Sequence, residues 1–126
     1  MAEQLNRTVA NVEFDGLLDA AYANHTVGVT VASGQGKLTR GTVLAINDAG
    51  KAVILGTAKA QGETNDPEAR YILNKDVDAT NADAVALAYD EGRFIKSKLI
   101  VKANYTITAA DIDALRVHNI CVADEL

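Results

Sequence analysis

The chain has 126 residues, a length that suits one domain and leaves little room for a second. Its composition is that of a folded globular protein, with 48% hydrophobic and 23% charged residues and a single proline. The net charge of −5 argues against a nucleic-acid-binding role, because an acidic surface repels phosphate groups.

The sequence shows no signal for export or for membrane insertion. Cys121 is the single cysteine, so no internal disulfide can form and a reducing compartment is expected. The N-terminus lacks the apolar segment that marks a signal peptide, and no stretch approaches the ~20 consecutive apolar residues of a membrane span. We therefore expect a soluble cytoplasmic protein that has no membrane partner.

The N-terminal part of the chain is predicted to be an arm followed by a strand. Residues 1–12 are polar and show no periodicity, so they are expected to form a flexible N-terminal arm on a single domain of residues 13–126. Residues 25–32 predict a strand, because valines with a period of two define one face. These valines are Val27, Val29 and Val31. A turn is predicted at 33–37.

A hairpin, a loop and a strand are predicted in the middle of the chain. Residues 41–46 and 51–55 are the two arms of the hairpin, because Asn-Asp-Ala-Gly at 47–50 is a turn signal. Residues 56–67 carry Gly, Asn, Asp and Pro and predict a loop. A strand is then expected at 70–73.

Two extended segments follow before the helix. Residues 84–89 predict a strand, Asp90-Glu91-Gly92 a turn or bulge, and residues 94–101 a further extended segment. A final extended piece is expected at 120–122.

One helix is predicted near the C-terminus. Thr108 can cap it, and Asp111 completes a variant of the capping box. Asn119 suits the left-handed residue that ends a helix. Its buried side is predicted to comprise Ile112, Leu115 and Val117. Short strands without strand–helix alternation predict a mainly β (α+β) fold, a compact antiparallel β-sandwich or barrel-like domain with one C-terminal helix.

The stretch from Asp76 to Thr80 reads Asp-Val-Asp-Ala-Thr, the spacing of a phosphatase loop in which the first aspartate attacks phosphorus. Such a loop needs the carboxyl end of a central strand in a parallel sheet, which the predicted fold does not offer. A calcium loop that began here would lack its glycine and its final glutamate. The stretch is better explained as a turn toward residues 84–89, with side chains that bond the backbone. The turn formers are Asp78, Asn81 and Asp83.

No other group of residues predicts catalysis or metal binding. His25 and His118 are far apart in the sequence, and Ser33 and Ser97 lack the context of a nucleophile elbow. Cys121 lies between two aliphatic residues and is predicted to be a buried, inert thiol. One cysteine and two separated histidines do not make a zinc site. We therefore predict no enzyme activity, no metal and no cofactor.

The order of the segments resembles that of the head decoration (capsid cement) proteins of tailed bacteriophages, the family typified by the lambda head protein D. The resemblance covers about residues 13 to 122. It rests on the blocks FDGLLDAAY, VTVASGQGKLTRGTVLAI, AGKAV, YILNKDVDATNADAVALAYDEGRF and ITAADIDALRVHNI, taken in that order.

The resemblance implies a structural role. Such a protein is a homotrimer that binds the major capsid protein on the outside of the expanded head, at three-fold and quasi-three-fold positions. It stabilises the head against the pressure of packaged DNA, and its N-terminal arm orders on the capsid by adding a strand to a sheet edge. The residues of this chain predicted for that capsid-binding arm are Thr8, Val9, Val12 and Phe14.

Two alternatives remain open on the sequence. One is a small β module that binds a non-capsid protein or a glycan. The other, more remote, is a phosphatase that uses Asp76 and Asp78.

Overall fold

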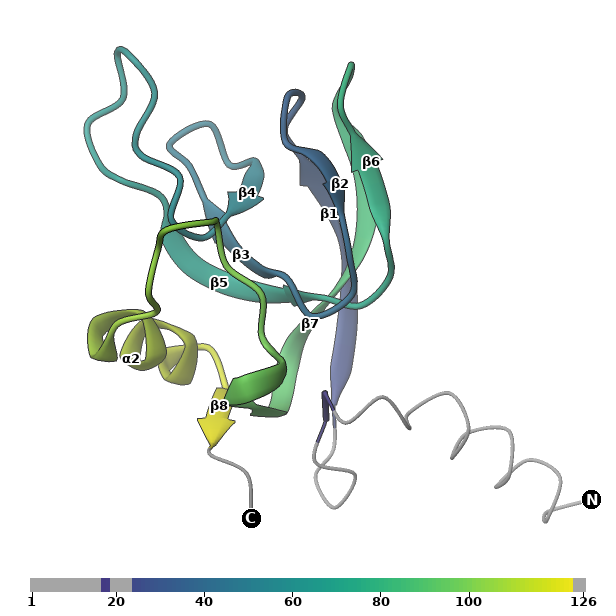
Figure 1. The fold of residues 1–126 in the computed structure, drawn as a ribbon, viewed down its shortest axis with the longest axis vertical. Helices are drawn as coiled ribbons and strands as arrows, with labels where there is room; N and C mark the ends of the chain where they lie inside the picture. The colour runs from purple at the N-terminus through teal and green to yellow at the C-terminus, as the bar shows by residue number, and fades with distance from the viewer. Residues whose placement is uncertain (1–16, 19–23, 124–126) are drawn as a thin grey trace, which may run out of the picture.

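The computed structural model describes residues 17–18 and 24–123, and it shows a mainly β protein with one helix near its C-terminal end (Figure 1). The elements in chain order are β1 (His25–Val31), β2 (Gly36–Leu38), β3 (Val43–Ile46), β4 (Ala52–Ile54), β5 (Glu68–Leu73), β6 (Val77–Ala79), β7 (Ala84–Ile95), a 3-10 turn (Lys96–Lys98), α2 (Ala109–Val117) and β8 (Ile120–Ala123). No helix within this part of the chain is long and apolar enough to cross a membrane.

Five strands form a barrel-like sheet. Neighbouring strands follow the order β1-β4-β3-β5-β7, and β7 pairs back with β1 to close the ring. The pairs are antiparallel except for β1–β4, which is parallel and is made where Val31 lies opposite Ala52. β8 adds to β7 as a parallel strand outside the ring. The predicted fold class, an antiparallel barrel-like domain with a C-terminal helix, is confirmed.

Strand β7 is the longest element and joins two segments that the sequence predicted as separate. It runs without a break from Ala84 to Ile95. Its register against β1 shifts where His25 pairs with Glu91 and Thr26 pairs with Tyr89, so one extra residue of β7 forms a bulge. The predicted bulge at 90–92 is confirmed. The predicted extended segment at 94–101 is interrupted by the 3-10 turn at Lys96–Lys98. The chain is extended again at Leu99, and Ile100 forms a bridge with Thr42.

Strands β2 and β6 form a small antiparallel sheet that the sequence did not predict. Gly36 lies opposite Ala79, and Leu38 lies opposite Val77. The predicted turn at 33–37 therefore ends earlier, and Val77–Ala79 forms a strand rather than part of a turn. Strands of three residues are too short to show a period of two. Leu38 and Ala79 are buried against the barrel interior, so this sheet packs on the barrel.

The sheet separates two apolar clusters because alternate residues of its strands point to opposite faces. The inner cluster draws on all five barrel strands and fills the barrel; it includes Val31, Leu44, Ala52, Leu73, Ala86 and Ala88. The outer cluster packs α2 and β8 against the other face of β3, β4, β5 and β7. It includes Val43, Val53, Ile72, Tyr89, Phe94, Leu115 and Ile120. Of the alternating valines predicted for β1, Val31 belongs to the inner cluster and Val29 packs against it.

Helix α2 begins and ends where the sequence predicted. The Thr108 hydroxyl accepts a hydrogen bond from the Asp111 N–H, and the Asp111 carboxylate accepts one from the Thr108 N–H, which completes the capping box. Asn119 has φ 67°, the left-handed conformation expected after a helix. Leu115 is fully buried, but Val117 is 77% exposed, so its predicted burial is wrong.

Cys121 is exposed, which corrects the prediction of a buried thiol. β8 is a strand at the end of the sheet, and its side chains alternate. Ile120 is fully buried in the outer cluster, so the next residue points away from it.

Candidate interaction surfaces

The aspartates of the Asp-Val-Asp-Ala-Thr stretch bond nearby groups of the chain. Asp76 Oδ1 accepts a hydrogen bond from the Arg40 N–H at 2.9 Å. Asp78 Oδ1 accepts hydrogen bonds from the Thr80 hydroxyl and the Thr80 N–H, and these bonds hold the pKa of Asp78 below its usual range. The two aspartates flank the start of β6, which pairs antiparallel with β2. This is a different setting from the parallel-strand end that a phosphatase loop requires.

Asp83 ties together the ends of three strands, as its predicted role in a turn implies. Its Oδ2 lies 2.7 Å from Lys51 Nζ, beside β4, and its Oδ1 accepts a hydrogen bond from the Ser33 N–H, after β1, at 2.8 Å. The Lys51 ammonium and the Ser33 N–H hold the pKa of Asp83 below its usual range. The carboxylate therefore stays ionised where β1, β4 and β7 converge.

Arg40 connects the turn before β3 to the residue that follows β5 and to the middle of β7. Its Nη1 donates to the carbonyl and to the side-chain oxygen of Asn74, each at 3.0 Å, and to the Tyr89 hydroxyl at 2.8 Å. Its guanidinium carbon lies 5.5 Å from the centre of the Tyr89 ring. These bonds connect the turn before β3 with the end of β5 and with a residue of the outer cluster, so Arg40 has a structural role.

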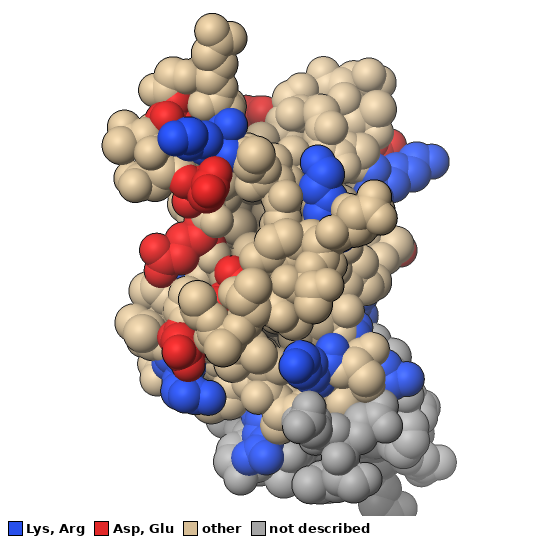
Figure 2. Space-filling view, turned by 60° about the vertical axis from the view of Figure 1, so that its left-hand side comes forward, with Lys and Arg blue, Asp and Glu red and all other residues tan. Residues whose placement is uncertain are grey.

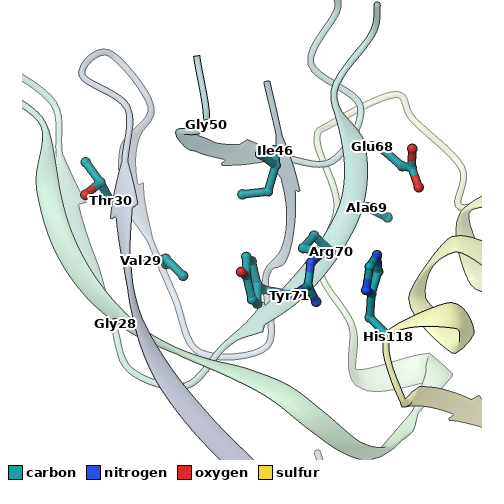
Figure 3. A pocket seen from close by; sticks show the side chains of 10 residues that line it. All are labelled: Gly28, Val29, Thr30, Ile46, Gly50, Glu68, Ala69, Arg70, Tyr71 and His118. Atoms are coloured by element: carbon teal, nitrogen blue, oxygen red, sulfur yellow. The ribbon is translucent and has the colours of Figure 1, made fainter. Parts of the chain in front are cut away.

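A hollow of about 580 Å³ opens between β1 and β5 (Figure 3). Val29 and Tyr71 point toward one another across it, and His118 lies at its rim near Arg70. The Arg70 guanidinium carbon is 4.6 Å from the centre of the Tyr71 ring. His25 is not part of this hollow, because its Nδ1 bonds Asp90 Oδ1 at 2.7 Å at the start of β1. The two histidines are therefore not brought together.

A second hollow, of about 710 Å³, lies between α2 and the residues that precede β5. Figure 2 shows Asp and Glu side chains following one another down one side of this face. The carboxylates that line the hollow are Asp48, Asp66, Glu68, Asp111 and Asp113.

Several carboxylates near this hollow stabilise the loop and the helix. Asp48 Oδ2 accepts a hydrogen bond from the Thr64 N–H at 2.7 Å, and Asp66 Oδ1 accepts one from the Lys59 N–H at 3.0 Å. The Tyr105 hydroxyl donates to Asp111, a bond that, together with burial, raises the pKa of Tyr105. Within residues 17–18 and 24–123, no three His, Cys, Asp or Glu side chains are grouped so that they could hold a metal ion.

The predicted capsid-binding residues Thr8, Val9, Val12 and Phe14 lie outside the described residues. The described chain starts with Leu17 and Leu18, which are both buried. The Leu17 carbonyl accepts a hydrogen bond from the Ile95 N–H at 2.9 Å, and Leu18 forms a bridge with Phe94. Leu17 and Leu18 are therefore fixed to the end of β7.

The fold is that of a compact β-barrel domain, in which Asp76, Asp78, Asp83 and Arg40 bond groups of the same chain. A family model of phage head proteins, bacteriophage lambda head decoration protein D, matches residues 10–120. The chain belongs to this family of head decoration proteins, which is structural rather than enzymatic, and its place is the capsid of the virion. A comparison with curated proteins found no match.

Proposed function

We propose that the protein is a capsid cement. It binds the major capsid protein on the outside of the expanded head as a homotrimer, at three-fold and quasi-three-fold positions, and stabilises the head against internal DNA pressure. The observation that carries this proposal is the family match over residues 10–120, which includes the whole barrel and α2.

The structure supports a mechanical role in two ways. The ring of strands is closed, so none of its strands ends the sheet with an unpaired edge. Both faces of β3, β4 and β5 are packed against apolar clusters, so the domain can act as a rigid body. The net charge of −5 suits a protein that contacts other proteins and not the packaged DNA.

We propose that the arm supplies much of the affinity for the capsid. Thr8, Val9, Val12 and Phe14 offer β-prone side chains to a sheet edge of the major capsid protein, where main-chain hydrogen bonds provide the binding energy. Three arms on one trimer raise the effective affinity well above that of one arm.

The purified protein is expected to co-sediment with expanded heads of its phage and not with unexpanded procapsids. The proposal places the binding surface on the expanded head, so the unexpanded procapsid is the matched particle that should not bind. The measurement is the amount of protein in the pellet for equal numbers of each particle, with protein alone as the control. Equal binding to both particles, or binding to neither, would contradict the proposal.

Deletion of residues 1–14 is expected to weaken binding to expanded heads by about 100-fold or more, because three linked contacts are lost at once. Binding is measured by titration of heads with the deletion variant, and far-UV circular dichroism reports whether the barrel is retained. A variant with residues 1–14 in scrambled order keeps the length and charge and serves as the control for sequence. Unchanged affinity after the deletion would show that the arm is not a capsid-binding segment.

A further inference from the structure

One part of the barrel surface carries no charged side chain, and we call it the uncharged face. It consists of Thr26, Gly28 and Thr30 of β1 with Val85 and Leu87 of β7. Gly28 pairs with Leu87 and Thr30 pairs with Val85, so these residues share one side of an antiparallel pair. Val85 is 78% exposed and Leu87 is 37% exposed.

The uncharged face is on the outer side of the barrel. Val29 and Val31 of β1 belong to the inner cluster, as do Ala86 and Ala88 of β7, so the residues between them point outward. Figure 3 shows this directly, because Val29 points into the hollow and Thr30 points to the other side of β1. On β3, β4 and β5 the same outer side is covered by α2 and β8, whereas Val85, Gly28 and Thr30 are exposed.

The face has the composition of an interface core with a charged rim. Antiparallel sheets that meet water normally carry polar or charged residues on that side, and cores of interfaces are depleted of charge. Charged groups lie at the two ends of this face. Asp90 bonds His25 at one end, and Asp83 pairs with Lys51 at the other, each at 2.7 Å.

A glycine, Gly28, lies at the centre of the uncharged face, although nothing in this chain requires a glycine there. It is not among the glycines with positive φ, and a Cβ at this position would meet only Val85 Cγ1, at 3.9 Å, which is ordinary contact. Neither the backbone nor the packing of this chain therefore requires glycine at the centre of the face. Glycine weakens a strand, and its presence inside one often marks a place where another backbone approaches closely.

We propose that the uncharged face is the surface through which copies of this chain pack against one another. The inference rests on the proposed function, which supplies the homotrimer. In an oligomer with rotational symmetry, residues near the axis meet their own copies, so any charge there is brought next to itself. Two copies of this chain carry the same net charge of −5, so their acidic surfaces repel one another. A face without charge lets two copies meet without that repulsion.

Val85→Lys tests the proposal, with Val117→Lys as the matched control, because the two valines are 78% and 77% exposed. Each variant adds one lysine at an exposed position, so the two should retain the fold to a similar degree, which circular dichroism and thermal melting report. Sedimentation equilibrium should give the wild type and Val117→Lys a mass three times the 13.3 kDa of the chain. Val85→Lys should weaken self-association by about 100-fold or more and sediment as single chains at the same concentration, because like charges are brought together.

Gly28→Leu is a second variant that adds bulk without charge. It should keep the fold, because a Cβ at Gly28 meets only Val85 Cγ1, at an ordinary contact distance of 3.9 Å, and it should also lose the trimer. Trimers of wild-type mass for both face variants would overturn the proposal, and so would a wild type that is a single chain. Variants that stay trimeric but lose binding to expanded heads would show that the face contacts the capsid instead, which also overturns it.

The two proposals can fail separately. If wild-type protein binds expanded heads while Val85→Lys remains a trimer, the cement function stands and the self-association surface is wrong. If Val85→Lys dissociates while wild-type protein binds no heads, the surface is supported and the function is not.

Discussion

Phe94→Ala is expected to lower the free energy of unfolding by about 3–5 kcal/mol. Phe94 is fully buried, and its ring meets that of Tyr89 edge-on, with centroids 5.2 Å apart and planes at 62°. It pairs with Val122 of β8 and bridges to Leu18. Truncation therefore leaves a cavity where β7, β8 and the start of the described chain meet, and no neighbour on the closed sheet can move far to fill it.

The measurement is urea unfolding followed by circular dichroism, at one fixed protein concentration because self-association adds to apparent stability. Val117→Ala is the control, since this side chain is 77% exposed and should change the free energy of unfolding by no more than about 0.5 kcal/mol. A loss below about 1 kcal/mol for Phe94→Ala would contradict the role given to this ring, because even small core truncations cost that much.

Gly56→Ala is expected to cost about 3 kcal/mol or more, although it adds a single methyl group, because backbone strain and overpacking act together. Gly56 has φ +106°, and a Cβ there would lie 2.7 Å from both Cβ and Cγ of Tyr105. Tyr105 cannot turn aside easily, because its hydroxyl bonds Asp111 in the first turn of α2. The clash therefore falls on the contact between the loop after β4 and the segment that leads into the helix.

Gly62→Ala in the same loop separates the two causes. Gly62 has φ +90°, but nothing lies within 4 Å of the position of its Cβ. It should cost only about 1 kcal/mol, the backbone part of the effect. Both variants can be compared by urea unfolding under identical conditions. Equal losses for the two variants would mean that the contact with Tyr105 adds nothing.

The sequence predicted correctly those helix ends and turns that are determined by residues at the ends themselves. Thr108 and Asp111 form the expected capping box, Asn119 takes the expected left-handed conformation, and the turn at 47–50 joins two strands that pair. The short strands β2 and β6 could not be predicted, because each is held by its partner 40 or so residues away and not by its own pattern. Ile120 and Cys121 show the same limit, since which of them faces inward depends on the pairing of β8 with β7.

The surfaces were harder to predict than the fold. The alternation of Thr26, Gly28 and Thr30 is visible in the sequence, but it does not reveal that Val85 and Leu87 lie beside these residues. It also does not reveal that α2 covers another part of the barrel and leaves this part exposed. Both facts come from tertiary packing, which period and composition do not encode.

The course of β7 has a mechanical consequence. The same strand carries the bond to Leu17 at one end and the uncharged face at the other. The Ile95 N–H holds the Leu17 carbonyl, so a pull on Leu17 is passed to β7. Because β7 pairs with β1, β5 and β8, that load is shared with three neighbouring strands and does not rest on one pair.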